Sequence, residues 1–197
     1  MERQETPAAF RELVRRQGIQ ARNALTETER EVFSQRAVSQ IVRSPEFQRA
    51  HHILIYRAIR GELRLNELET AALSMGKQLA YPVCLNGQDM AALCLREGAA
   101  WVKGRYGIDE PSWEHSDVIP PENLDMVLCP CTAFGEACNR MGMGAGFYDR
   151  YLPQCGNACI AAAAFEAQKS ACIPAMPWDH PLDVVYTEKA VYRRSRG

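Results

Sequence analysis

The chain has 197 residues, 47% of them hydrophobic, with 23 lysines and arginines against 24 aspartates and glutamates. This length and apolar content fit one domain with a full core, so we treat 1–197 as a single domain. The formal net charge of −1 excludes a general nucleic-acid or membrane-surface binder and leaves open a local basic site for one anionic ligand.

The ends and the cysteines indicate a cytoplasmic protein. The charged start, residues 1–5, leads into no apolar stretch, and the longest apolar run, 158–165, is far too short to span a membrane. We therefore expect no membrane or nucleic-acid partner, and a monomer. None of the eight cysteines belongs to a Cys-x-x-Cys pair, so we expect free thiols packed as small hydrophobic groups rather than disulfides or a zinc site.

Two helices are predicted at the amino end. Thr6 precedes a proline and a run of helical periodicity, which predicts a helix over 8–25. Thr26 and Glu29 have the spacing of a capping box, which predicts a second helix to about Arg43.

The first helix carries a basic stripe. Arg11, Arg15 and Arg22 are separated by four and seven residues, which puts them on one helix face. Such a stripe is typical of a solvated face.

Alternating strands and helices follow, with turn signals between them. We predict strands at 52–58, 78–84, 90–95, 124–129, 158–164 and 184–187, helices at 65–75 and 147–152, a loop-rich segment at 96–123 and a solvated tail at 193–196. Asn86-Gly87 predicts a hairpin between the second and third strands. The pattern indicates an α/β fold of three layers, α/β/α, with a mainly parallel central sheet and an added β-hairpin.

The most informative segment is 139–150, in which Gly142, Gly144 and Gly146 alternate. Glycines let the backbone approach a ligand closely, and successive N–H groups and a helix start can hold an anion. Arg140 and Arg150 flank the loop and suit phosphate oxygens. A ligand-free glycine-rich turn is the alternative, since the spacing matches neither the dinucleotide fingerprint nor a Walker loop.

Asp149 is an acid beside this expected anion site. An acid there indicates a mediating cation, and Mg²⁺ on a nucleotide would serve. As an exposed acid at a cation site, Asp149 is expected to contribute to turnover far more than to stability.

Residues 140–152 resemble the signature of the 5-formyltetrahydrofolate cyclo-ligase family, and the resemblance runs from about Arg11 to Glu188. Further matching blocks occur in order at 61–63, 81–82, 106–111, 164–168 and 178–188. The family converts 5-formyltetrahydrofolate to 5,10-methenyltetrahydrofolate and releases ADP and phosphate. The resemblance therefore implies a ligase of one-carbon metabolism with ATP as co-substrate, Mg²⁺ as cofactor and a reduced folate as substrate.

The resemblance also implies roles for residues at the matching positions. The ATP contacts would be Arg11, Arg15, Arg140, Gly142, Met143, Gly144, Ala145, Gly146, Phe147 and Tyr148. Glu62, Tyr148 and Trp178 would contact the folate, and Asp149 and Asp183 would contact Mg²⁺ directly or through water. Arg140, Tyr148 and Asp149 form the expected catalytic set.

Some positions depart from the family pattern. Arg60 and Arg64 make the folate-side loop more basic, Trp178 stands where histidine is common, Cys138 replaces a common glycine, and Ala145 fits its loop if its φ is negative. These departures motivate an alternative, a non-catalytic folate- or nucleotide-binding paralogue. The layering alone would also permit a sugar-phosphate isomerase or a CoA-transferase-like enzyme, whose activity would need no ATP.

Overall fold

The computed structural model describes residues 6–96 and 98–195; the charged start, 1–5, and Arg196 of the tail lie outside this part. Two capped helices begin it, as predicted. In α1 (Pro7–Asn23) the Thr6 hydroxyl accepts a hydrogen bond from the N–H of Ala9, and α2 (Glu27–Arg43) starts with the complete capping box. A short helix, α3 (Pro45–Arg49), follows.

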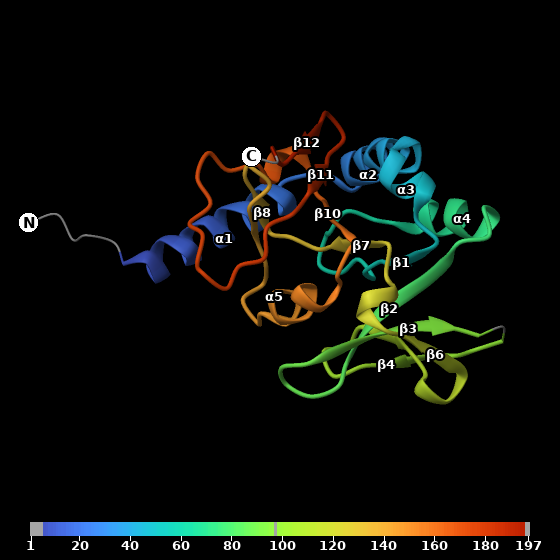
Figure 1. The fold of residues 1–197 in the computed structure, drawn as a ribbon. Coiled ribbons are helices and arrows are strands. Elements are labelled where there is room, and N and C mark those ends of the chain that lie inside the picture. Colours follow the sequence, from blue (N-terminus) through green and yellow to red (C-terminus); the bar gives the residue numbers. More distant parts are fainter. Residues whose placement is uncertain (1–5, 97, 196–197) are drawn as a thin grey trace, which may run out of the picture.

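The described residues form a central sheet of eight strands in the order β12-β11-β10-β7-β1-β2-β3-β6 (Figure 1). These strands are β1 (His52–Leu54), β2 (Gln78–Cys84), β3 (Met90–Leu95), β6 (Ser116–Ile119), β7 (Met126–Cys129), β10 (Cys159–Ala163), β11 (Val184–Tyr186) and β12 (Val191–Arg193). Neighbours from β11 through β2 pair in parallel, while β12, β3 and β6 are antiparallel. This confirms the mainly parallel sheet.

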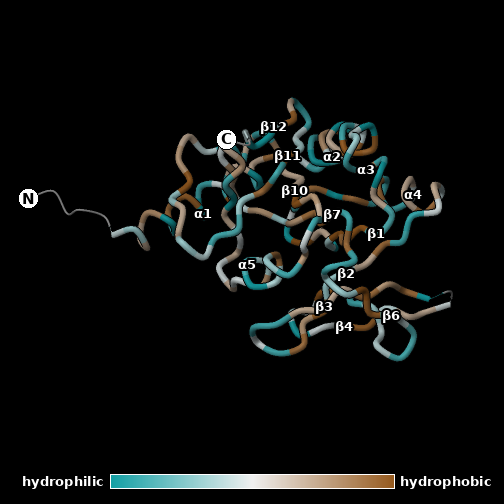
Figure 2. The backbone as a smooth tube through the Cα atoms, in the orientation of Figure 1, coloured by the Kyte–Doolittle hydropathy of each residue, from teal (hydrophilic) through white to brown (hydrophobic). Residues whose placement is uncertain are grey.

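Side chains alternate along the strands and enter two cores, one on each face of the sheet. Ile53 and Leu128 belong to the core under α2, α3 and α4 (Asn66–Ser74). Leu54 and Val127 belong to the other, which packs on α5 (Phe147–Tyr151) and a 3₁₀ turn, η3 (Leu152–Gln154). Figure 1 shows α2 and α3 above the central strands and α5 below them. In Figure 2, the hydrophobic stretches of β1 and β10, drawn in brown, lie between these helices. The three layers are therefore confirmed.

The first helix lies outside these layers. It packs through Val14 on two short strands, β8 (Ala133–Phe134) and β9 (Arg140–Met141). Gly18 permits this approach, because a Cβ there would overlap the carbonyl oxygen of Thr132. In Figure 1, α1 runs beside β8. The basic stripe is thus carried to the segment that leads into the glycine-rich loop.

The predicted hairpin is confirmed. Strands β2 and β3 pair from Ala80↔Cys94 to Cys84↔Met90, and the Asn86 side-chain oxygen accepts from the N–H groups of Gln88 and Asp89. This side chain closes the turn that its sequence predicts.

Two predictions were wrong in detail. The strand at 52–58 ends at Leu54. The segment 96–123, expected as loop, holds β6 on the sheet edge, the small hairpin of β4 (Trp101–Lys103) and β5 (Asp109–Pro111), and two 3₁₀ turns, η1 (Trp113–His115) and η2 (Pro121–Asn123). Flanking prolines and glycines conceal such short edge strands.

Residues 193–195 of the tail are exposed, as predicted, but the tail is also bound to the fold. Arg193 closes β12 and pairs with Glu46, and Arg194 pairs with Asp183 at 2.9 Å. A last 3₁₀ turn, η4 (Glu166–Gln168), packs on α1. None of the helices in the described residues combines the length and apolarity that a bilayer crossing requires.

Candidate active site

The glycine-rich loop, Gly142–Gly146, joins β9 to α5. Its start lies near the carboxyl end of β7, because Thr132 donates its hydroxyl to the carbonyl of Met141 at 3.0 Å. Thr132 is three residues beyond that strand. Gly144 and Gly146 have φ values of +102° and +72°, which side-chain-bearing residues rarely adopt. Ala145 is not among the described non-glycine residues with positive φ, so its side chain fits without strain. Met143, Gly144 and Ala145 are exposed.

Each glycine of the loop faces a different guanidinium group. A Cβ at Gly142 would lie 3.2 Å from Nη1 of Arg140, and one at Gly146 would lie 2.7 Å from Nη1 of Arg150. A Cβ at Gly144 would lie 3.5 Å from Cζ of Arg15. Because the three glycines have no side chains, three guanidinium groups can lie close to one exposed loop. Their positive charges suit a polyanion.

The positive charge at the loop comes mainly from these arginines and not from the helix behind it. Helix α5 has five residues, so its dipole is small beside full charges. Arg15 donates from Nε to the carbonyl of Gly142 at 2.8 Å. Arg150 donates to the carbonyls of Gln88 and Ala145, at 2.7 and 2.9 Å, and so joins the loop to the β2–β3 turn.

Arg11 has a different partner. Its guanidinium pairs with Asp179, with Nη2 3.0 Å from Oδ1, and also donates to the carbonyl of Pro174. The side chain is 16% exposed. Arg11 therefore fixes the segment around Asp179 to α1 at the border of the loop region.

Arg140, Asp149 and Tyr148 form a compact group behind the loop. Arg140 Nη2 donates to Asp149 Oδ1 at 2.6 Å, and the Arg140 Cζ lies 5.7 Å from the centroid of the Tyr148 ring. The side chain of Arg140 is 4% exposed and that of Asp149 is 22% exposed. The buried Tyr148 hydroxyl and Arg140 Nε have no hydrogen-bond partner within the described residues. Burial raises the pKa of Tyr148 well above its ordinary value, so the hydroxyl stays neutral.

Glu62 is buried beyond the carboxyl end of β1. Its Oε2 accepts a hydrogen bond from the N–H of Ile59 at 3.1 Å, and its Oε1 lies 3.8 Å from Nη1 of Arg22. Burial raises the pKa of Glu62, and the Ile59 N–H and the Arg22 charge oppose that rise. The Glu62 carboxylate contributes to the raised pKa of Tyr148, so the structure brings these two predicted folate contacts into one neighbourhood.

Three further predicted site residues lie nearer the periphery. Phe147 packs edge-on to Tyr106 with ring centroids 6.0 Å apart. Trp178 is 64% exposed, next to Asp179. Asp183 lies at the amino ends of β10 and β11, where its Oδ2 accepts from the N–H of Ile160 at 3.0 Å.

The structure does not place Asp149 and Asp183 in a shared cluster of ligands. Within residues 6–96 and 98–195, no group of three or more histidine, cysteine, aspartate or glutamate side chains is arranged to hold a metal ion. The cysteines of this part are free thiols.

Sequence reasoning misjudged two residues of this region. Arg22, assigned to a solvated stripe, is 1% exposed and faces Glu62. The available signal was Gly18, one helical turn earlier on the same face, since a mid-helix glycine often marks a close contact. Asp179, the partner of Arg11, was also missed.

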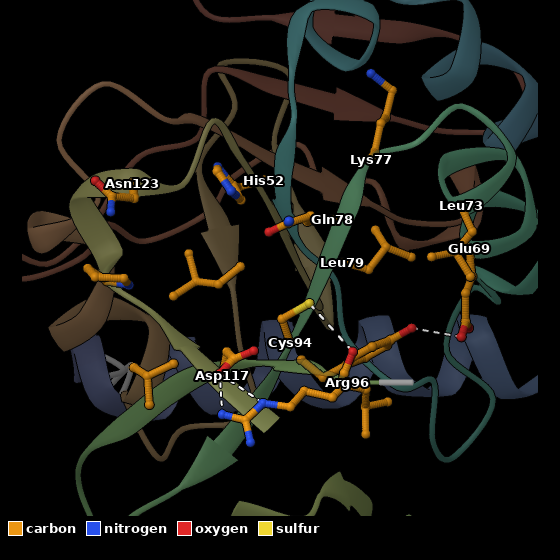
Figure 3. Close-up of a pocket in the computed structure, with 15 residues that line it drawn as sticks. His52, Glu69, Leu73, Lys77, Gln78, Leu79, Cys94, Arg96, Asp117 and Asn123 are labelled. Atoms are coloured by element: carbon orange, nitrogen blue, oxygen red, sulfur yellow. Dashed lines mark hydrogen bonds and ion pairs between the residues drawn. The ribbon is translucent and has the colours of Figure 1, made fainter. Parts of the chain in front are cut away.

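Two cavities lie elsewhere in the described residues. One of about 660 Å³ is formed by β2, β3, β6 and α4. Two pairs of its polar side chains are bonded to each other: Tyr81 donates to Glu69, and Figure 3 shows Arg96 paired with Asp117. Another, of about 800 Å³, lies at the amino ends of the parallel strands and includes Asp183. Neither is lined by the glycine-rich loop.

The fold and these contacts define an α/β protein with an arginine-lined, glycine-rich loop near the carboxyl ends of its parallel strands. Comparison with known proteins identifies the family. The model of the 5-formyltetrahydrofolate cyclo-ligase family matches residues 8–188. The chain is 30% identical over 177 residues to the 5-formyltetrahydrofolate cyclo-ligase of Escherichia coli K12, covering 88% of this chain and 97% of that enzyme.

Two solved structures share the fold. The 5,10-methenyltetrahydrofolate synthetase of Aquifex aeolicus superposes with a TM-score of 0.84 at 29% identity, over 95% of this chain and 94% of that one. The corresponding protein of Mycoplasma pneumoniae gives 0.74 at 22% identity, over 90% and 98%. This chain belongs to the 5-formyltetrahydrofolate cyclo-ligase family.

Proposed function

We propose that this chain converts 5-formyltetrahydrofolate to 5,10-methenyltetrahydrofolate with ATP and Mg²⁺ and releases ADP and phosphate. The observation that carries the nucleotide half of the proposal is the loop in which three glycines admit three guanidinium groups, those of Arg140, Arg15 and Arg150. Family membership, over residues 8–188, supports the folate half.

The chemistry needs alignment and charge neutralisation more than a protein nucleophile. An N-formyl group is a poor electrophile, so its oxygen first attacks the γ-phosphorus of ATP, and ADP leaves. N10 of the same folate then attacks the activated carbon, phosphate leaves and N10 loses its proton. The second step is intramolecular and gains from orientation. The protein's part is to hold the phosphates and the formyl oxygen together.

The residues of the site suit these tasks. The backbone of Gly142–Gly146, including Met143 and Ala145, would hold the phosphates, with Arg15 and Arg140 neutralising their charge. Arg11 would act at the border of that site, from its pair with Asp179, and Phe147 would pack beside the nucleotide. Tyr148, whose buried hydroxyl has no partner in the described residues, would contact both substrates.

Glu62 would bind the pterin ring, which presents N–H donors that an ionised carboxylate accepts. The exposed indole of Trp178 would cover the outer part of the folate.

The donor set fits an ion carried by the nucleotide. Mg²⁺ is usually held by one or two carboxylates together with substrate phosphates and water, and it needs no protein cage. The pairing of Asp149 with Arg140 beside the glycine-rich loop supports this role for its carboxylate. When bound, the ion would neutralise phosphate charge. Asp183 stays a predicted contact, and its hydrogen bond to Ile160 favours a structural role.

The test is direct. Incubation of the protein with 5-formyltetrahydrofolate and MgATP should produce the near-ultraviolet absorbance of the methenyl product and one ADP per turnover. Tight folate binding in calorimetry with no turnover would instead identify a non-catalytic paralogue. Conversion without ATP would contradict the proposed mechanism.

A further inference from the structure

Arg22 is the most deeply buried charged side chain of the described residues. It projects from the last turn of α1 and is 1% exposed. Its Nε and Nη1 have no hydrogen-bond partner in the described part of the chain. A buried guanidinium with unmade hydrogen bonds is costly, so its position calls for an explanation other than stability.

The group that Arg22 faces is Glu62. Nη1 of Arg22 lies 3.8 Å from Glu62 Oε1, beyond hydrogen-bond distance, while Oε2 is held by the N–H of Ile59 at 3.1 Å. Arg22 and Glu62 therefore attract each other through their charges without forming a hydrogen bond. Oε1 of Glu62 can still accept a hydrogen bond from another group.

The backbone before Glu62 is constrained as well. Arg60 has a φ of +48°, in the left-handed region that residues with a Cβ rarely adopt, and Gly61 follows at +78°. Such strain persists only where the surroundings impose it, and it is commonest at functional sites. The turn therefore aims Glu62 inward towards α1.

Charged and titratable groups surround Glu62 on several sides. Arg22 faces it from α1 and Arg60 from its own turn, and both lower its pKa. Tyr56, Cys131 and Tyr148 face it from other segments, and each has its own pKa raised by the Glu62 charge. Burial alone would favour the protonated acid, and Arg22 is the buried cation that opposes this.

We propose that Arg22 is a positioning residue that keeps Glu62 ionised, with Oε1 open, so that the carboxylate can accept the N–H donors of the reduced pterin. This inference rests on the proposed function, in which Glu62 binds the folate. A protonated Glu62 would present a donor to a ring edge that also presents donors, and binding would weaken. Arg22 itself is too buried to touch the substrate and acts through Glu62.

The test uses a neutral and a charged replacement. Arg22→Gln leaves no unpaired buried charge, because Glu62 can take a proton, so the variant should fold. We expect its KM for 5-formyltetrahydrofolate to rise about tenfold or more near pH 6.5 and to recover as pH rises and Glu62 ionises, with KM for ATP unchanged. Arg22→Lys keeps the charge and should retain the pH profile of the wild type.

Arg30→Gln is the matched control. Arg30 packs against the same turn, with Cδ 3.8 Å from a Cβ built on Gly61, and donates to the carbonyl of Leu25 at 2.7 Å. This variant should leave the pH dependence of the folate KM unchanged.

A double variant provides a measure independent of activity. Glu62→Gln leaves the Arg22 charge buried without a counter-charge, so urea unfolding should show a loss of stability. Adding Arg22→Gln should restore part of that stability. The effects of the two substitutions on the folate KM should not multiply, because both remove the same carboxylate charge.

The outcomes separate this inference from the proposed function. If Arg22→Gln raises the folate KM equally at all pH values and multiplies with Glu62→Gln, Arg22 is merely structural and the inference is overturned. If Glu62→Gln leaves the folate KM unchanged, the assignment of Glu62 to the folate fails first. If Glu62→Gln raises it and Arg22→Gln does not, only the inference about Arg22 fails.

Discussion

Asp149 shows how one contact changes a residue's expected behaviour. The sequence suggested an exposed acid that contributes to turnover far more than to stability. The structure gives it a side chain only 22% exposed and an ion pair with Arg140, whose side chain is 4% exposed. Asp149 is therefore not the exposed acid that the sequence suggested, and removing its carboxylate would leave a buried guanidinium unpaired, so we expect a larger loss of stability than an exposed acid would give.

Asp149→Asn separates the two roles. The amide oxygen can still accept from Arg140, so stability should fall by only about 1 kcal/mol. Turnover should fall about 100-fold, equivalent to about 2.7 kcal/mol, and half-maximal rate should need more Mg²⁺. A Mg²⁺ titration of the steady-state rate measures this. Asp109→Asn, at the exposed pair with Lys103, is the control. Normal turnover with an unchanged Mg²⁺ requirement would show that Asp149 has no part in the metal site.

Arg60 offers a test of backbone strain. It is exposed and has a φ of +48°. Arg60→Gly should raise the free energy of unfolding by about 1 kcal/mol, because glycine adopts this conformation without steric penalty. Gly61→Ala, at φ +78°, should lower it by a similar amount. Urea titration measures both, and a destabilised Arg60→Gly variant would contradict the account.

At the scale of elements, α1 unites the site. It carries Arg15 to the glycine-rich loop, Arg11 to Asp179 and Arg22 to Glu62. Its position depends on one close approach, that of Gly18 to the carbonyl of Thr132.

Gly18→Ala tests this docking. Alanine favours helix more than glycine by about 1 kcal/mol, but its methyl group would overlap Thr132. We expect a net loss of about 1–3 kcal/mol in unfolding free energy and a raised KM for ATP as α1 shifts. Gln17→Ala, on the exposed face of α1, is the control and should be neutral or stabilising. Should Gly18→Ala gain stability, the close approach would not be a constraint on the helix.

Local signals predicted the elements that depend on few neighbours. The capping box at Thr26 and the Asn86 turn satisfy backbone groups within three residues, so the sequence alone defines them. The glycine-rich loop was found for the same reason. The burial of Arg22 was not predicted, because it depends on how α1 packs against the rest of the fold. The contacts that set this packing join segments far apart in the sequence.

For the whole molecule, the parallel centre of the sheet was predicted and its edges were not. Buried central strands appear in the sequence as apolar runs such as Ala158–Phe165. The edge strands β6 and β12 are short and half polar, so no such run marks them. The last strand, β12, pairs with β11, and Arg193 adds a link to the rest of the fold by pairing with Glu46 of α3.

This link predicts an acid sensitivity of folding. Burial acts to raise the pKa of Glu46, but hydrogen bonds from Arg193, from its own backbone N–H and from Tyr186, together with the Arg193 charge, hold that pKa below its ordinary value. Its contribution is therefore complete above the unfolded pKa of about 4.3 and is lost as pH falls through the lower folded value. Glu46→Gln should cost about 1 kcal/mol near pH 7 and nothing near pH 2, as measured by urea unfolding. Glu31→Gln, exposed on α2, is the control. A difference that persisted undiminished in acid would rule out the charge pair as its source.

The pairing of Arg11 with Asp179 spans 168 positions along the chain. During synthesis α1 leaves the ribosome first, yet the loop and the segment that complete its surroundings emerge near the end. Nucleotide binding therefore cannot stabilise a nascent chain until most of the chain has been translated. Messages truncated before the codon for Asp179 should yield polypeptides that no amount of ATP protects from proteolysis.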